Sequence, residues 1–370
     1  MTAPLPPPVH GAAAVSRQIK ESAVINQAFD CDYINSSTSR RIDEVNSFSL
    51  SKLFRHIAIF FEILWKLISR RYDLCYLAIT CHGKGFLKDA PFVLLCKLFC
   101  KRIVIHQHNK GMASDVGRWP YRWLLPLVYK DCKVILLSWY LYPDIEKIVP
   151  KENVLICPNG ISITPNNREI LNQGSDLSSD ESKERDSIPR ILFLSNLIES
   201  KGVIVLLNAL KILTDKGYSF LCDIVGDKTK EIDAKRLAEE VGKRHLNGLV
   251  EYQGRKYGAE KEKAFEKSDI FVFPTYYETF GLVNLEAMAH KLPIVSTNEG
   301  GIPDVVKDGE NGLICEKKDP ESLANCIEKL LTDEKLRKEM GQKGYERYCQ
   351  LFTSESFEAR MTECLNKCIN

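Results

Sequence analysis

Two glutamates, Glu278 and Glu286, stand eight residues apart in the most informative stretch of the chain, Phe273–Ala289. The apolar run before them predicts a strand that ends near Pro274, and Gly281 predicts the opening of a helix that carries Glu286. A helix N-terminus offers unpaired N–H groups and a positive dipole end, which together suit a phosphate. Glu286 could accept two hydrogen bonds from a vicinal diol such as a ribose, and Glu278 could reach a second polyhydroxyl group across the phosphates. Taken alone, two glutamates at this spacing are more often a solvated surface pair.

The elements that would position these residues alternate between short apolar runs and longer helix-length segments. Strand-like runs lie at 29–35, 73–80, 102–107, 133–138 and 153–158, and again at 190–196, 220–226, 249–254, 269–274, 293–296 and 312–315. Helix-length segments lie at 12–27, 50–71, 85–100 and 120–130, and again at 202–216, 230–246, 282–290, 321–331 and 334–348. Such alternation predicts two doubly wound α/β domains with parallel sheets, whose ligands bind at the carboxyl ends of the strands.

Domain boundaries follow from where this alternation stops. Residues 166–187 are rich in Asn, Ser, Asp, Glu and Lys without apolar periodicity, which predicts a linker or surface loop. We therefore expect an N-terminal domain at 1–165 and a C-terminal domain at 188–352. Pro6, Pro7 and Pro8 cannot donate hydrogen bonds to a sheet, so the opening residues predict a loop, and we expect the first strand of the N-terminal domain to be missing.

Composition predicts a globular, cytoplasmic protein. The chain is 44% hydrophobic and 27% charged, and no run reaches the length of a membrane span. Thirteen cysteines without a CxxC pair predict reduced, mostly buried thiols, and no signal peptide is recognisable. Residues 1–160 carry 21 Lys and Arg against 13 Asp and Glu. That balance fits an anionic membrane surface or an anionic acceptor, and ordinary surface variation explains it equally well.

The stretch around the two glutamates resembles the Glu-x7-Glu signature of the retaining glycosyltransferases of family 4, also called glycosyl transferases group 1. The similarity continues through Lys291–Thr297, Gly300–Val306 and Asp308–Leu313, and upstream through Ile224–Asp227. The resemblance implies the GT-B fold, in which two Rossmann-like domains face a cleft. It also implies a C-terminal helix, at 353–370, that crosses back to the N-terminal domain.

At matching positions of the C-terminal half, the resemblance implies a donor site. Glu278 would contact the donor sugar, Glu286 would bind the ribose, and Lys201 would bind the phosphates, although a lysine at a helix start is also common on a plain surface. The backbone of three consecutive residues would contact the sugar and diphosphate: Phe280, Gly281 and Leu282.

One donor-binding position departs from the family pattern. Asn196 stands where the family usually has an arginine that follows a glycine. One expected phosphate-neutralising cation is therefore absent, and Lys201 alone or another cation would take over its work.

In the N-terminal half the resemblance implies two further contributions. His108, after a predicted strand, would face the donor sugar as a catalytic residue, with His106 as its competitor and a structural histidine as the plain alternative. His10 and Gly11 lie where the family has a Gly-rich loop near the phosphate or the acceptor.

The expected function is that of a retaining, metal-independent glycosyltransferase. It would move a sugar from a nucleoside-diphosphate sugar to a hydroxyl of a glycan or lipid-linked acceptor, in cell-surface polysaccharide or glycolipid synthesis. No cofactor other than the donor, no metal ion and no nucleic acid is expected. Two alternatives stay open: a sugar-nucleotide epimerase of the same fold, and a degenerate GT-B protein that binds without catalysis.

Membrane contact is the last question that the sequence raises. Segments Leu53–Arg71 and Lys97–Lys110 combine aromatic or aliphatic residues with Lys and Arg. They could make a peripheral contact with an anionic membrane. Alternatively, they could form amphipathic helices that face the core. We expect the apolar face to pack on the core, and we leave the basic rim as the candidate contact.

Overall fold

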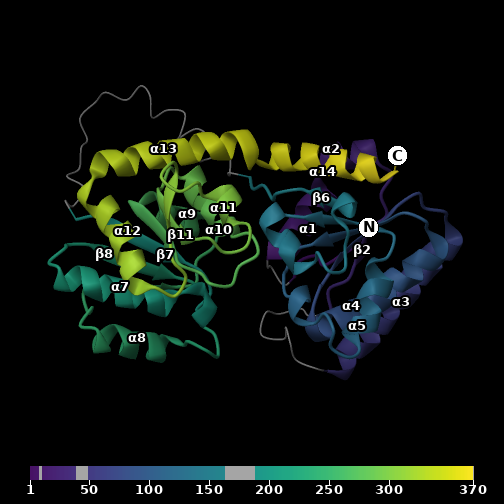
Figure 1. The fold of residues 1–370 in the computed structure, drawn as a ribbon, viewed down its shortest axis with the longest axis horizontal. Coiled ribbons are helices and arrows are strands. Elements are labelled where there is room, and N and C mark those ends of the chain that lie inside the picture. Colours follow the sequence, from purple (N-terminus) through teal and green to yellow (C-terminus); the bar gives the residue numbers. More distant parts are fainter. Residues whose placement is uncertain (8–10, 39–48, 163–187, 370) are drawn as a thin grey trace. The chain divides into compact units, whose positions relative to one another are not determined.

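The computed structural model describes residues 1–7, 11–38, 49–162 and 188–369. They form two compact units, one made of Met1–Asn159 and Ser354–Asn370 and the other of Gly160–Thr353. Each unit holds one six-stranded sheet in which every paired strand runs parallel, with helices on its faces (Figure 1). The predicted α/β class with two doubly wound sheets is confirmed.

The first unit follows the predicted alternation of strands and helices. Its strands are β1 (Thr2–Ala3), β2 (Ile34–Asn35), β3 (Cys75–Ile79), β4 (Ile103–Gln107), β5 (Cys132–Leu136) and β6 (Val154–Ile156), in the order β2-β1-β3-β4-β5-β6. Its helices before residue 159 are α1 (Gly11–Glu21), α2 (Ala23–Ala28), α3 (Leu50–Ser69), α4 (Gly83–Phe99) and α5 (Tyr121–Tyr129). β3 and β4 are buried at every position, as expected of parallel strands that helices cover on both faces.

The expectation that a first strand is missing was wrong. β1 lies between β2 and β3, where Thr2 pairs with Ile34 on one side and with Leu77 on the other. The three prolines that argued against a strand, Pro6 to Pro8, lie after these two residues. The two residues Thr2 and Ala3, which precede the prolines, therefore form a strand inside the sheet.

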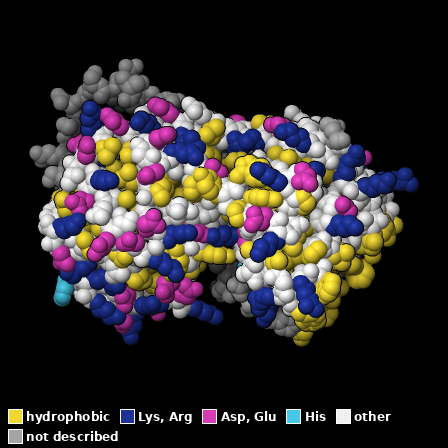
Figure 2. Space-filling model, in the orientation of Figure 1, with side chains coloured by type: hydrophobic (Ala, Val, Ile, Leu, Met, Phe, Trp, Pro, Cys, Tyr) yellow, Lys and Arg dark blue, Asp and Glu magenta, His cyan; other side chains and the backbone are white. Residues whose placement is uncertain are grey.

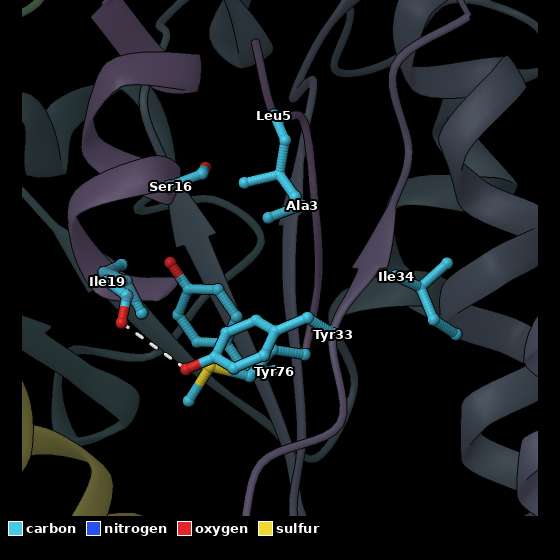
Figure 3. A pocket seen from close by; sticks show the side chains of 8 residues that line it. Ala3, Leu5, Ser16, Ile19, Tyr33, Ile34 and Tyr76 are labelled. Atoms are coloured by element: carbon cyan, nitrogen blue, oxygen red, sulfur yellow. Dashed lines mark hydrogen bonds between the residues drawn. The ribbon is translucent and has the colours of Figure 1, made fainter. Parts of the chain in front are cut away.

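A small pocket lies beside the short strand β1 (Figure 3). Ala3, from β1, faces Ser16 and Ile19 of α1 across it, and Tyr33 and Tyr76 close its lower end. The Tyr33 hydroxyl donates to the Ile19 carbonyl at 3.4 Å, which joins the β2 side of the pocket to α1. Side chains from β1, from α1 and from the residues around β2 and β3 thus meet at this pocket.

The last helix, α14 (Ser354–Ile369), belongs to the first unit although it follows the second in sequence. Phe357, Met361 and Leu365 are buried in the same core cluster as residues of β1 and β3. The Ser22 hydroxyl donates to Glu358 Oε2 at 2.6 Å, which joins α14 to the start of α2. This helix completes the core of the first unit.

The second unit repeats the same architecture. Its strands are β7 (Arg190–Leu194), β8 (Leu221–Val225), β9 (Val250–Gly254), β10 (Ile270–Phe273), β11 (Ile294–Thr297) and β12 (Gly312–Cys315). Its α-helices are α7 (Val203–Asp215), α8 (Ala234–Lys243), α9 (Ala259–Glu266), α10 (Leu282–Ala289), α11 (Ile302–Val305), α12 (Pro320–Thr332) and α13 (Glu334–Leu351). The sequence analysis missed α9, because this short helix buries only Ala264 and Phe265 and so carries almost no apolar periodicity.

The order of strands in the second sheet fixes where a ligand can bind. The sheet runs β12-β11-β10-β7-β8-β9, so the chain leaves β7 in one direction and β10 in the other. In parallel sheets of this kind a ligand binds in a crevice outside the carboxyl ends of the strands, at the point where the strand order reverses. Lys201 follows β7 and Glu278 follows β10, so both stand at this switch point.

Candidate active site

The loop after β7 is held against the loop after β10 by hydrogen bonds. Lys201 closes the short 3-10 helix η5 (Glu199–Lys201). The neighbouring Ser200 carbonyl accepts from the backbone N–H of Tyr276 at 2.9 Å and from the Thr275 hydroxyl at 3.0 Å. These contacts bring the Lys201 side chain to Tyr277 and Glu278, the next residues of the loop after β10.

Lys201 and Glu278 form an ion pair at the switch point. Lys201 Nζ lies 2.8 Å from Glu278 Oε2 and 3.2 Å from the Tyr277 carbonyl. The other carboxylate oxygen of Glu278 accepts from the backbone N–H groups of Thr279 at 2.8 Å and Phe280 at 3.3 Å. Burial, the largest single influence, raises the pKa of Glu278, but Lys201 and the two amides together outweigh it and hold that pKa below its ordinary value. Glu278 is therefore an ionised, oriented hydrogen-bond acceptor.

Gly300 lets a second loop close over the Glu278 backbone. A Cβ at this position would lie 2.3 Å from the Glu278 carbonyl oxygen and 2.7 Å from that of Thr279. The next residue, Gly301, donates its backbone N–H to the Thr279 carbonyl at 2.8 Å. The Gly300-Gly301 pair that carries part of the family resemblance thus fixes the backbone of the Glu278 loop by direct contact.

The residues between Glu278 and α10 have different surroundings. Gly281 has a φ of +79°, and a Cβ there would lie 2.8 Å from Asn284 Nδ2. Phe280 is buried with its ring edge-on to Phe352 at 6.3 Å between centroids, and Leu282, the first residue of α10, is half-buried. The side chain of Phe280 therefore anchors the loop in the core, while the backbone turns into the helix.

Glu286 lies in α10, and its two carboxylate oxygens have different surroundings. Its Oε1 accepts from Lys261 Nζ at 2.7 Å, and both side chains are largely buried. Within the described residues its buried Oε2 has no hydrogen-bond partner. An unmatched buried carboxylate oxygen is costly to leave without a donor, so the position suits a ligand hydroxyl.

Asn284 and Lys261 are site residues that the sequence analysis did not identify. Asn284 is fully buried beneath Gly281, and neither its Oδ1 nor its Nδ2 has a partner in the described part of the chain. Lys261 lies on α9, the helix that the sequence analysis missed, and no local pattern links it to Glu286. The polarity of Asn284, which apart from Glu286 stands among apolar residues in the helix Leu282–Ala289, was the one available signal.

Asn196 lies at the carboxyl end of β7 with an exposed side chain, close to the switch point. The next residue, Leu197, donates its backbone N–H to the Asp227 carbonyl at 2.8 Å, and Asp227 Oδ2 accepts from Arg255 at 3.1 Å. The Arg255 guanidinium also lies 4.7 Å from the centre of the Tyr257 ring. A guanidinium from the loop after β9 is therefore tied to the Asn196 loop, where the resemblance had left a missing cation.

The first unit holds the two candidate histidines, in β4 and in the loop that follows it. His106 is fully buried, and its Nδ1 and the Tyr76 hydroxyl lie 2.6 Å apart. Burial lowers the pKa of His106 well below its ordinary value, and His108 lowers it further. His108 is half-buried, and its ring lies 4.0 Å from that of His106 between centroids. Of the two candidate histidines, His106 is a core residue and only His108 has an exposed surface.

The backbone after His108 is fixed by one carboxylate. Asp144 accepts from the N–H groups of Gly111 at 2.8 Å, Met112 at 3.1 Å and Ala113 at 3.1 Å. Gly11 is the exposed first residue of α1, whereas His10 lies outside the described residues. The His108 loop is thus preorganised within its own unit.

The described residues show neither a metal site nor a membrane span. No group of three or more His, Cys, Asp or Glu side chains there is placed to hold a metal ion. Among the helices of the described ranges, none has both the length and the apolar character needed to cross a membrane. All 13 cysteines are free thiols.

Known proteins resemble this chain in sequence and in fold. Residues 175–347 match the family model described as glycosyl transferases group 1. The capsular polysaccharide biosynthesis glycosyltransferase CapM of Staphylococcus aureus is 31% identical over 163 residues, which is 44% of this chain and 42% of that protein. The alignments to the first curated relatives span about half of their length.

Two solved structures share the fold over most of the chain. Sucrose-phosphate synthase from Thermosynechococcus elongatus superposes with a TM-score of 0.68 at 21% identity, and covers 91% of this chain and 83% of its own. HepE of Anabaena, solved in complex with UDP, also has a TM-score of 0.68, at 18% identity, with 84% and 82% covered. The chain therefore has two parallel-sheet units with the GT-B fold, and residues 175–347 are similar to the glycosyl transferases group 1 family.

Proposed function

We propose that this protein transfers a sugar from a nucleoside-diphosphate sugar to a hydroxyl group of a glycan or lipid-linked acceptor, with retention at the anomeric carbon and without a metal ion. One observation carries the proposal. Glu278 and Glu286, one ionised and oriented and the other with an unpartnered buried oxygen, flank the N-terminus of α10 at the switch point of the sheet. That arrangement matches a polyol on either side of a diphosphate.

The donor would bind along the loop from Glu278 to Glu286. The diphosphate would accept from the amides at the N-terminus of α10, which point toward the crevice because helix N–H groups run toward that end. The ribose diol would donate to Glu286 Oε2. The sugar hydroxyls would donate to Glu278, whose carboxylate is already held by Lys201 and two amides.

Charge on the leaving nucleoside diphosphate would be stabilised by cations without a metal. Lys201 stands beside Glu278 and would turn toward the phosphates when the donor binds. Arg255 is tied to the loop of Asn196 through Asp227, so its guanidinium could supply the charge that the absent family arginine would carry. Preorganised positive charge of this kind stabilises charge that develops in the transition state.

Retention follows from attack on the face that the diphosphate leaves. The acceptor oxygen would form its bond to the anomeric carbon as the bond to the phosphate oxygen breaks, and the departing phosphate oxygen would take the proton of the acceptor hydroxyl. His108 would contact the donor sugar, and the Gly11 end of α1 would line the phosphate or acceptor side. A lipid-linked acceptor would place the reaction at the cytoplasmic face of a membrane, in polysaccharide or glycolipid assembly like that named for CapM.

Nucleotide binding is the first test. Thermal unfolding should be measured with UDP, GDP and their sugar conjugates, beginning with UDP because HepE was solved with it. A ligand at about 100 times its Kd adds roughly 2.7 kcal/mol, which would raise Tm by several degrees. We expect one nucleotide to do so, and Glu286→Ala to abolish the rise.

Glu339→Ala supplies the matched control. Glu339 is an exposed glutamate of the same unit that is also paired to a lysine, Lys335. The control should respond to the nucleotide like the unmodified protein. Absence of any nucleotide effect in the full chain would contradict the proposal and favour a protein without donor binding.

Product analysis separates transfer from epimerisation. The protein would be incubated with the donor that passes the binding test, with and without a membrane extract as acceptor. Transfer predicts that sugar becomes attached to acceptor material, with the anomeric configuration of the donor by NMR. Interconversion of donor sugars without acceptor would instead identify an epimerase.

A further inference from the structure

Helix α3 is apolar on two opposite faces. One face is buried against the first unit through Ile59, Ile63 and Leu67. The other is an exposed stripe of large apolar side chains at spacings of three and four residues, which keeps them on one side of a helix: Leu50, Phe54, Ile57, Phe61, Trp65 and Ile68. The expectation that the apolar face of this segment packs on the core is therefore only half right. One apolar face of α3 is buried in the core, and the other is exposed.

The two following helices extend this exposed surface. α4 packs beside α3, where the rings of His56 and Phe92 lie 4.5 Å apart, and beside α5, where Lys97 Nζ donates to the Leu127 carbonyl at 2.8 Å. Exposed apolar residues lie at the end of α4, just before α5 and along α5: Leu98, Phe99, Trp119, Trp123 and Leu127. We call the two exposed sets together the apolar surface. Figure 2 shows hydrophobic side chains gathered along the edge of the molecule where Figure 1 places α3.

The degree of exposure is unusual for such residues. Trp65 is 71% exposed, Trp119 78% and Trp123 69%. Isolated exposed apolar side chains are ordinary on protein surfaces, but a contiguous patch of them marks a place of interaction. Three of the four tryptophans of the chain lie on this one surface.

The charged residues of the three helices and their ends are mostly positive, although Asp32 pairs with Lys66 and Asp30 with Arg70 at the end of α3. Residues 50–71, 83–102 and 118–130 together contain 13 Lys and Arg and only two acidic residues, Glu62 and Asp89. Asp89 is buried and accepts from the Thr80 backbone N–H at 3.0 Å. Exposed cations border the apolar residues at the ends of the helices, among them Arg71, Lys101 and Arg102. The surface therefore offers apolar contact within a positive field.

We propose that the apolar surface docks this protein on an anionic lipid bilayer, with α3 lying in the plane of the headgroups. Its buried face fixes α3 on the protein, so the exposed stripe can enter the membrane only sideways. Tryptophan favours the interface between headgroups and acyl chains, and the surrounding Lys and Arg attract anionic lipids. A symmetric contact between two copies would instead set this basic surface against itself.

Vesicle flotation of the full chain tests this proposal. Vesicles of phosphatidylcholine with phosphatidylglycerol are compared with vesicles of phosphatidylcholine alone, at low and at high salt. We expect binding to the anionic vesicles that high salt weakens. The double variant Phe61→Ser and Trp65→Ser should lose at least about tenfold in binding, since two side chains no longer enter the interface. Both positions are exposed, so the variant should keep the Tm of the unmodified protein.

Trp139→Ser is the matched control, because Trp139 is an exposed tryptophan of the same unit outside the three helices. It should bind vesicles like the unmodified protein. The charge variant Lys101→Glu with Arg102→Glu should weaken binding to anionic vesicles by roughly tenfold or more.

Two results would overturn the proposal. One is the absence of binding to either kind of vesicle. The other is a concentration-dependent dimer without vesicles that the Phe61 and Trp65 double variant abolishes, which would assign the surface to a second copy of the chain. Neither result depends on nucleotide binding, so failure here leaves the proposed transfer reaction to its own tests.

Discussion

Lys201 Nζ lies 2.8 Å from Glu278 Oε2, although the two residues are 77 positions apart in the chain. About a fifth of each side chain is exposed, 20% for Lys201 and 19% for Glu278. The pair forms because β7 and β10 are neighbours at the switch point of the sheet. A donor that binds here would meet an ionised carboxylate and an ammonium group already in place, which lowers the cost of organising the site.

Lys201→Met should leave a folded protein with little transferase activity. The change removes the cation for the phosphates and leaves the carboxylate of Glu278 with its two amide donors alone. Loss of one preorganised electrostatic contact reduces kcat on the order of 10²–10³-fold, and Lys201→Arg should recover part of it. Steady-state kinetics with the donor identified by binding would measure this. Lys211→Met, which removes a lysine paired to Asp215 on α7, is the control, and equal losses in the two variants would contradict a specific role.

Gly300→Ala should displace the Glu278 loop. The added Cβ would lie 2.3 Å from the Glu278 carbonyl oxygen, and φ at Gly300 is +54°, so backbone must move. We expect weaker nucleotide binding, a lower Tm and a retained far-UV circular dichroism spectrum. Gly242→Ala, within α8 and with open space for a Cβ, should raise stability by about 0.5–1 kcal/mol instead. Unchanged nucleotide affinity in Gly300→Ala would show that the loop tolerates the displacement.

His290 should make the stability of the second unit depend on pH near neutrality. Burial, the largest single influence, lowers its pKa, but Glu262 at 2.8 Å and the Glu286 carbonyl raise it, so the pKa of His290 lies above its ordinary value near 6.5. A group whose pKa is raised by folding contributes stability that is complete below about pH 6.5 and is lost as the pH rises through its folded pKa. Tm should therefore fall as the pH rises above 6.5. The decline should be smaller in His290→Gln, and an identical pH profile in both proteins would refute this assignment.

Phe357→Ala should destabilise the first unit although residue 357 follows the second in the chain. Phe357 is fully buried in the core cluster that α14 shares with β1 and β3, and removal of such a side chain costs about 3–5 kcal/mol. All four tryptophans, at positions 65, 119, 123 and 139, lie in this unit, so tryptophan fluorescence during urea unfolding reports on it. Its midpoint should fall in Phe357→Ala. Phe265→Ala, in the core of the second unit, should leave that midpoint in place if the two units unfold separately.

The local elements of the second unit were predictable from sequence. Most of its strands are buried on both faces and therefore appear as short apolar runs, although β9 is not, and each of the six observed strands overlaps a predicted run. The positions of Glu278 before a helix and of Glu286 within it follow from the chain itself, because they depend on the strand, turn and helix of one continuous segment.

Pairings between distant segments were not predictable. Lys261 meets Glu286, and Lys201 meets Glu278, only because strand order brings separate loops to one edge. β1 was missed because two residues are too few to show a period, and only pairing with β2 and β3 identifies it as a strand.

The sequence by itself determined the fold class and the segment that carries the candidate donor site, since these depend on local pattern and motif. The tertiary structure alone decided which apolar residues are covered. In α3 the periodicity is compatible with burial of either face, and the packing takes Ile59, Ile63 and Leu67 while it leaves Phe61 and Trp65 in solvent. A helical pattern states that apolar side chains share a face, but only the neighbours of the helix decide whether protein, lipid or water meets that face.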